Sequence, residues 1–166
     1  AFVSMFCVQG NMNMMMAMTA LALRRHDFSL SAISLSVAIH VMGMFGLSLP
    51  LGKLADKVGR RNVMLLGLFL ASAGSWFVVA TPLYIVTTTG TFLVGLGWSC
   101  VNIAATALYA DTTSPGERGR VIGANDTFTA AAAISMPIVG GVVVEYLGYQ
   151  ILGFFGMAIM IPALLF

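Results

Sequence analysis

Six long apolar stretches, separated by short connections, account for almost the whole sequence. Hydrophobic residues make up 59% of the 166 residues and charged residues only 8%, whereas about a quarter of an average soluble domain is charged. A helix needs about 20 apolar residues to cross a bilayer and must satisfy its own backbone hydrogen bonds there. We therefore predict an all-α integral membrane protein with six transmembrane helices, at residues 1–23, 29–51, 62–80, 83–110, 121–144 and 149–166.

The positions of the basic residues indicate how these helices are oriented. Six of the eight lysines and arginines fall in the second and fourth connections, residues 52–61 and 111–120, against Arg24 and Arg25 in the first. Cytoplasmic loops of membrane proteins are enriched in Lys and Arg. We therefore expect both chain ends on the cytoplasmic side, in a plasma membrane or bacterial inner membrane. The net charge of +2 gives no indication of a nucleic-acid partner.

The two ends of the sequence suggest that it belongs to a longer polypeptide. The sequence begins at Ala1 without an initiator Met or a charged leader segment. It stops at Phe166, inside an apolar stretch. We therefore expect a fragment, while a complete six-helix protein remains the alternative.

A repeat with an offset of 89 residues divides the sequence in two. The offset places three apolar stretches on the next three, so the copy of a cytoplasmic turn falls on the opposite side of the membrane, as in inverted transporter repeats. We expect one six-helix bundle built as a 3+3 inverted repeat from residues 1–80 and 81–166; chance matches among many glycines are the alternative. The matching pairs are Gly52 and Gly141, Asp56 and Glu145, Gly59 and Gly148, and Gly67 and Gly156.

The second connection carries the most specific motif in the sequence. It reads Gly-x-x-x-Asp-Lys-x-Gly-Arg-Arg between two predicted spans, and it resembles the signature loop of the major facilitator superfamily. The resemblance implies the amino-terminal half of a twelve-helix secondary transporter, whose two six-helix halves rock about a central site. We interpret residues 52–61 as a tight turn. The candidate conformational-switch residues are Gly52, Asp56, Lys57, Gly59, Arg60 and Arg61.

Asp56 has two interpretations. In the family that the motif resembles, the matching acid latches to the other half of the transporter and helps to hold one conformation. We place Asp56 near the start of the third helix, where backbone amides and the helix dipole favour a carboxylate. A helix cap among charges that only set the topology is therefore the alternative to a latch.

The fourth span departs from one family pattern. Drug-exporting members carry Arg-x-x-Gln-Gly-x-Gly there, whereas this sequence has Thr91 and Val94 at the positions of the arginine and glutamine. The family assigns that arginine a part in proton coupling. The sequence therefore does not support proton-driven antiport through this position.

Polar side chains within the apolar stretches form a second set of candidates, because ionisable groups inside a bilayer are costly. His40 lies in the middle of its stretch, where it could take up a proton or only hydrogen-bond to another helix. Asp126 could line a cavity or pair with Arg118 or Arg120 at the cytoplasmic rim. The candidate cavity and proton residues are Gln9, Asn13, His40, Trp98, Asn102, Asn125 and Asp126.

The amides of the first span cannot all face one cavity. Gln9 and Asn13 are four residues apart and share one face of a helix, while Asn11 points elsewhere. Only one of these two sets can face a central path. Polar packing between helices is the alternative for both.

No cofactor, metal or catalytic motif can be recognised. Five methionines between residues 12 and 18 spread around the whole helix without a neighbouring Cys or His, which favours adaptable packing over metal binding. Cys7 and Cys100 lie singly in apolar stretches, and no zinc spacing or phosphate-binding glycine loop occurs. We expect no cofactor, no metal and no enzymatic activity.

Two functions remain open at this stage. The first is a secondary active transporter that moves a small organic solute by alternating access, with the lipid bilayer and a second six-helix half of the same or another chain as partners. The second is a degenerate, non-transporting subunit of the same fold that packs with other membrane subunits in a larger complex. A gene that encodes twelve spans would favour the first function, and copurification of a six-span product with a large complex would favour the second.

Overall fold

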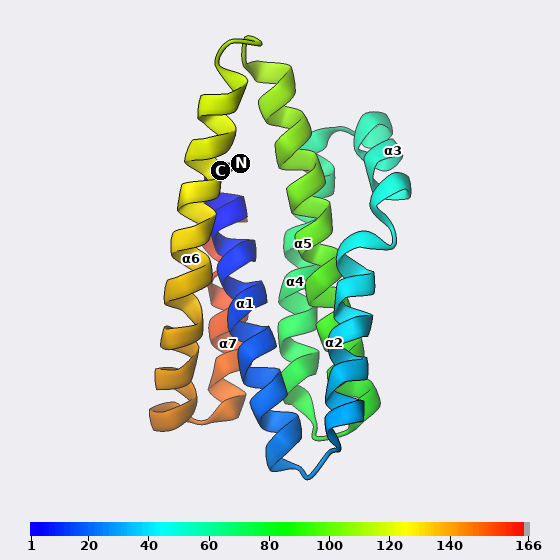
Figure 1. Ribbon diagram of the computed structural model, residues 1–166, viewed down its shortest axis with the longest axis vertical. Coiled ribbons are helices and arrows are strands. Elements are labelled where there is room, and N and C mark those ends of the chain that lie inside the picture. The colour runs from blue at the N-terminus through cyan, green and yellow to red at the C-terminus, as the bar shows by residue number, and fades with distance from the viewer. Residues whose placement is uncertain (165–166) are drawn as a thin grey trace.

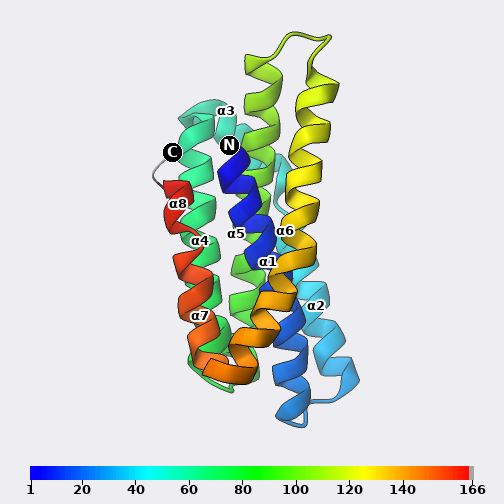
Figure 2. The ribbon, with the colours of Figure 1, turned by 90° about the vertical axis from the view of Figure 1, so that its left-hand side faces the viewer.

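The computed structural model describes residues 1–164, which are helical throughout apart from short connections. Helices α4 and α7 lie at the back, α1 and α5 in the middle, and α2 and α6 at the front (Figure 1), and the perpendicular view shows the same three layers (Figure 2). The helices are α1 (Phe2–Arg25), α2 (Leu30–Phe45), α3 (Ser48–Val58), α4 (Arg60–Ala80), α5 (Tyr84–Thr112), α6 (Arg118–Leu147), α7 (Tyr149–Ala158) and α8 (Ile161–Leu164).

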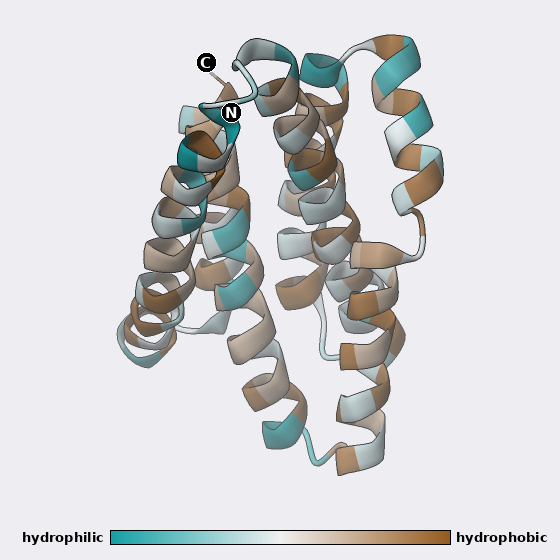
Figure 3. Ribbon diagram, turned by 45° about the horizontal axis from the view of Figure 1, so that its top comes forward, coloured by the Kyte–Doolittle hydropathy of each residue, from teal (hydrophilic) through white to brown (hydrophobic). Residues whose placement is uncertain are grey.

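Four helical segments are long and apolar enough to cross a membrane, which agrees with the predicted all-α membrane protein. They are Leu30–Val58, Arg60–Ala80, Tyr84–Thr112 and Arg118–Leu147, the first of which combines α2 and α3. The apolar segment Tyr149–Leu164 is shorter, and α1 is not among the four. Hydrophilic residues gather where helices end, while apolar colours dominate between those ends (Figure 3). The count of six spans stays a prediction.

The connections alternate between the two ends of the bundle. The turn from α3 to α4 and the connection from α5 to α6 lie at one end, and the connections from α1 to α2, from α4 to α5 and from α6 to α7 lie at the opposite end (Figure 1). Because residues 52–61 and 111–120 hold six of the eight basic residues, these six share one end. The end with this positive charge is called the basic end below.

The second predicted span is interrupted after Phe45. The prediction of a tight turn at residues 52–61 is wrong, because α3 extends through most of these residues. Helix α2 stops at Phe45, whose carbonyl accepts a hydrogen bond of 2.8 Å from the Ser48 hydroxyl. Helix α3 begins at Ser48 and has Pro50 in its first turn, where the missing proline N–H would have no helical partner in any case. Most of the predicted turn is therefore the end of α3, and the chain reverses at Gly59 alone.

Two glycines with nearly equal backbone angles make the reversals at opposite ends. Gly59 joins α3 to α4 with φ 94° and ψ 148°, and Gly148 joins α6 to α7 with φ 88° and ψ 164°. Residues with a side chain rarely adopt such angles, whereas glycine adopts them readily. The helices therefore extend closer to each turn than predicted. The connection between α5 and α6 is also shorter than predicted and comprises only residues 113–117, because α5 continues to Thr112 and α6 starts at Arg118.

The last predicted span is also divided. Helix α7 ends at Ala158, and α8 resumes at Ile161 with Pro162 in its first turn. Proline at this place cannot donate a hydrogen bond to the preceding turn. The prediction extended this span to residue 166, and its final two residues lie outside the described part.

A glycine seam holds α4 against α5. A Cβ atom added to Gly97 would lie 2.5 Å from the carbonyl oxygen of Gly67, and one added to Gly90 would lie 2.8 Å from that of Gly74. Without side chains at these four positions the two backbones can touch directly, as small residues allow in membrane helices. The seam makes α4 and α5 a tightly packed pair.

We predict that Gly97→Ala destabilises the protein by about 1–3 kcal/mol, because the added methyl group would force α4 and α5 apart. Thermal melts of the full-length protein in detergent should show a lower midpoint. Gly123→Ala is the matched control, because its Cβ would meet nothing within 4 Å on the exposed side of α6. Equal melting of both variants would contradict the tight seam.

Candidate functional site

Two helices of the middle layer are joined by an amide and an indole. The Trp98 indole N–H on α5 donates a hydrogen bond of 2.7 Å to the side-chain oxygen of Gln9 on α1. The Asn13 side-chain nitrogen donates to the backbone carbonyl of Gln9 over 2.9 Å. The Phe45 ring of α2 stands edge-on to Trp98 with 6.0 Å between ring centroids. Together with Asn102, one turn further along α5, these residues form the amide–indole cluster. Gln9, Asn13, Trp98 and Asn102 are all half-buried.

The opposite face of α1 is committed to packing. Asn11 is fully buried, and its amide nitrogen donates to the Ser75 hydroxyl of α4 over 2.9 Å. Its amide oxygen accepts a hydrogen bond from the same hydroxyl over 3.1 Å. A Cβ atom at Gly156 of α7 would lie 2.6 Å from that oxygen, so α7 also closes over Asn11. Gln9 and Asn13 therefore lie on a different face of α1 from Asn11, as their spacing predicted.

His40 lies in a polar seam between α2 and α5. Its side chain is 2% exposed, and its Nδ1 atom is 2.7 Å from the Thr91 carbonyl oxygen. Because a carbonyl oxygen only accepts, Nδ1 carries the hydrogen in this contact. The Thr88 hydroxyl donates to Ser36 over 3.3 Å in the same seam. The side chain of Thr91, at the position of the family's arginine, lies in this seam with its hydroxyl 3.5 Å from that of Ser36.

A third polar group lies near the basic end, where α5 meets α6. The Tyr109 hydroxyl donates to the Asn125 amide oxygen over 2.8 Å, and both side chains are buried. The Asn125 amide nitrogen is 3.5 Å from a carboxylate oxygen of Asp126, which is exposed. Within residues 1–164 Asp126 forms no ion pair, and Arg118 instead donates to the Ala110 carbonyl over 2.8 Å. The alternative pairing of Asp126 with Arg118 or Arg120 is therefore absent from this conformation.

Arg60 joins three helices at the basic end. As the first residue of α4, it forms an ion pair with Asp56 on α3 and a second with Asp111 on α5, with 3.2 Å between its Nε and a carboxylate oxygen. Both carboxylates are more than half exposed, and ion pairs in water are weak. These three residues form the Arg60 cluster.

The placement of Asp56 near the start of a helix is wrong. Asp56 lies in the last turn of α3, where the helix dipole disfavours a carboxylate, and the guanidinium of Arg60 supplies the compensating charge. The helix-cap interpretation therefore fails. Asp111 was not among the predicted site residues. Its place at the basic end, in the predicted connection of residues 111–120, was a signal that could have identified it.

The other motif residues have simpler surroundings. Gly52 lies inside α3 with space for a methyl group. Lys57 and Arg61 are exposed, and their side chains form no hydrogen bond or ion pair within residues 1–164. Of the six predicted switch residues, the structure brings Asp56 and Arg60 into contact and uses Gly59 for the turn.

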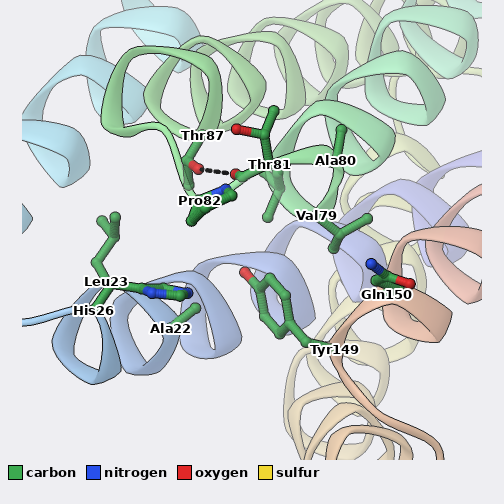
Figure 4. Close-up of a pocket in the computed structure, with 11 residues that line it drawn as sticks. Ala22, Leu23, His26, Val79, Ala80, Thr81, Pro82, Thr87, Tyr149 and Gln150 are labelled. Carbon is green, nitrogen blue, oxygen red and sulfur yellow. Dashed lines mark hydrogen bonds between the residues drawn. The ribbon is translucent and has the colours of Figure 1, made fainter.

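A cavity at the other end of the bundle was not predicted. It has a volume of about 250 Å³ and lies between the end of α1, the turn from α4 to α5 and the start of α7. The His26 ring and the Tyr149 hydroxyl point into it (Figure 4), while Thr87 donates to the Thr81 carbonyl over 3.3 Å at its edge. The Tyr149 hydroxyl is buried without a hydrogen-bond partner in the described structure.

Comparison with known proteins shows the family. The profile of the Major Facilitator Superfamily matches residues 1–166. The riboflavin transporter RfnT of Brucella anthropi is 32% identical over 72% of the chain and 30% of its own length. The uncharacterized MFS-type transporter YddS of Bacillus subtilis is 30% identical over 93% of the chain and 36% of its own.

A third relative is named for multidrug resistance. The multidrug resistance protein MdtL of Escherichia coli O81 is 30% identical over 84% of the chain and 36% of its own length. The chain thus spans about a third of the length of the curated relatives that it matches. The family match over all 166 residues, on a bundle of apolar helices with the motif at a glycine turn, shows that the chain belongs to the major facilitator superfamily.

Proposed function

We propose that this chain is the amino-terminal six-helix half of a secondary active transporter that moves a small organic solute by alternating access. The Arg60 cluster is the observation that carries this proposal. It links α3, α4 and α5 through exposed ion pairs at the end of the bundle that holds most of the positive charge. Such contacts can form in one conformation and separate in another at small cost.

The second half of the fold would complete the path. In this proposal α1, α2, α5 and α6 surround the path, α4 and α7 face lipid, and α7–α8 together make the sixth span. The 3+3 inverted repeat is supported by Gly59 and Gly148, which lie 89 residues apart and share their backbone angles. The basic end faces the cytoplasm, with both chain ends there, in a plasma membrane or bacterial inner membrane.

The amide–indole cluster supplies the solute contacts on this side of the path. Its members on α1, Gln9 and Asn13, lie on a different face of that helix from Asn11, which bonds to α4 in the back layer. His40 and Asp126 are the candidate proton carriers, because they are the ionisable side chains inside the predicted spans 29–51 and 121–144. Two of the named relatives are transporters, one of them of riboflavin, so a non-transporting subunit is not favoured.

We predict that Arg60→Met lowers uptake by the full-length protein at least about ten-fold, because two carboxylates would be left near each other without a counter-charge. Uptake of riboflavin and of a panel of organic cations into cells measures this. Arg60→Lys should retain part of the activity. Arg120→Met is the control, because it removes one exposed charge from the same end outside the cluster.

The same variants test the role of the cluster as a latch. If the latch closes the cytoplasmic side, Arg60→Met should favour the inward-open state and reduce labelling of Ala17→Cys by an external maleimide. Ala17 is exposed and lies one turn beyond Asn13 on α1. Normal uptake together with unchanged labelling would show that the cluster is not a switch.

We predict that His40→Ala or Asp126→Asn removes the pH dependence of uptake into vesicles, because either change deletes a group that can carry a proton. Uptake measured between pH 5 and pH 8 gives the profile. Asp27→Asn, an exposed change beyond the end of α1, should leave it intact. A wild-type profile in both variants would exclude both residues as proton carriers.

A further inference from the structure

We infer that the amide–indole cluster selects uncharged, planar heteroaromatic solutes whose edges carry both hydrogen-bond donors and acceptors. The inference rests on the proposed transport function, because it assumes that this face of α1 and α5 meets the solute. It adds the chemical class of the solute, which neither the motif nor the Arg60 cluster indicates. Three properties of the cluster support it: its lack of charge, its free amide groups and its fixed indole.

The middle of the solute face carries no formal charge. Neither α1 between Phe2 and Leu23 nor α5 between Tyr84 and Ala110 contains an Asp, Glu, Lys, Arg or His residue. His40 on α2 is turned into the seam with α5, and Asp126 on α6 lies beside Asn125 near the basic end. A charged solute at Trp98 would lose water without meeting an opposite charge, which is costly at this depth.

The amides of the cluster retain unused hydrogen-bonding groups. The Gln9 oxygen accepts from Trp98, but the Gln9 side-chain nitrogen has no partner within residues 1–164. The Asn13 nitrogen is used within α1, which leaves its side-chain oxygen available. Asn102 makes no side-chain hydrogen bond in that range and is half-buried. The cluster therefore has free amide donors at Gln9 and Asn102 and free amide acceptors at Asn13 and Asn102, which suits a solute with both kinds of group on one edge.

The indole gives the cluster a flat surface of fixed orientation. Trp98 lies midway along α5, held by its hydrogen bond to Gln9 on one side and by contact with Phe45 on the other. Phe45 is 59% exposed, so an aromatic surface extends outward from Trp98. Aromatic rings prefer offset-stacked or edge-to-face neighbours. A planar ring can therefore stack beside Trp98 while its polar edge reaches the amides.

Binding of three aromatic probes that differ in charge tests this solute class. Equilibrium dialysis at pH 7 of the full-length protein in liposomes measures dissociation constants for lumichrome (neutral), ethidium (cationic) and 2-naphthoate (anionic). We expect lumichrome to bind at least about ten-fold more tightly than either charged probe, a ratio that corresponds to about 1.4 kcal/mol. Tighter binding of a charged probe, or no binding of lumichrome, would overturn the inference.

Paired variants place the binding at the cluster. Gln9→Leu and Trp98→Phe should each weaken lumichrome binding about ten-fold, as expected for loss of one buried hydrogen bond. The controls are Gln150→Leu and Trp76→Phe, which change the only other glutamine and tryptophan of the sequence at exposed positions. Equal effects of the controls, or none from the cluster variants, would place the binding elsewhere.

A charge substitution separates recognition from folding. Gln9→Glu keeps the size of the side chain and its acceptor for Trp98, but adds a negative charge. It should shift preference from lumichrome towards ethidium, which a purely structural role of Gln9 would not produce. An unchanged order of affinities in Gln9→Glu would contradict direct contact between Gln9 and the solute.

Counterflow of labelled lumichrome distinguishes this inference from the transport proposal. Tight, cluster-dependent binding without counterflow would support the solute class and contradict transport. Counterflow of a charged probe with the same affinity in Gln9→Leu would support transport and contradict the solute class.

Discussion

The packing of this protein depends on the absence of water from the hydrocarbon layer. Polar atoms there must find partners within the protein. Helices in a membrane associate by close packing and by a few specific hydrogen bonds, because burying apolar surface gives no gain over contact with lipid. The glycine seam between α4 and α5 provides the close packing by letting two backbones touch. The bonds from Asn11 to Ser75, from His40 to Thr91 and from Trp98 to Gln9 provide partners for polar atoms.

These bonds divide the polar residues into two groups. Asn11 and His40 are buried and face neighbouring helices, so their hydrogen bonds align α1 with α4 and α2 with α5. Gln9, Asn13, Trp98 and Asn102 are only half-buried, and the three amides keep side-chain groups without a hydrogen-bond partner within residues 1–164. The Arg60 cluster is different again, since it lies at the end of the bundle, where water weakens each ion pair and makes its separation easy.

The all-helical membrane character, the family and the placement of the basic residues at one end were predictable, because each depends on composition and on the order of segments along the chain. The tight turn at residues 52–61 was wrong, because Gly, Lys and Asp look like a loop in sequence although α3 extends through them to Val58. The placement of Asp56 failed for the same reason. The helical face of Gln9 and Asn13 was predictable, because helix geometry alone decides it.

The sequence by itself determined the all-helical membrane character and the placement of most basic residues at one end, because both follow from the order of apolar and charged residues along the chain. Only the tertiary structure decided which polar groups meet. Asp111 is 51 residues from Arg60, Ser75 is 64 from Asn11, and Trp98 is 89 from Gln9. Such contacts follow from how helices pack in three layers, and no pattern of nearby residues records that packing.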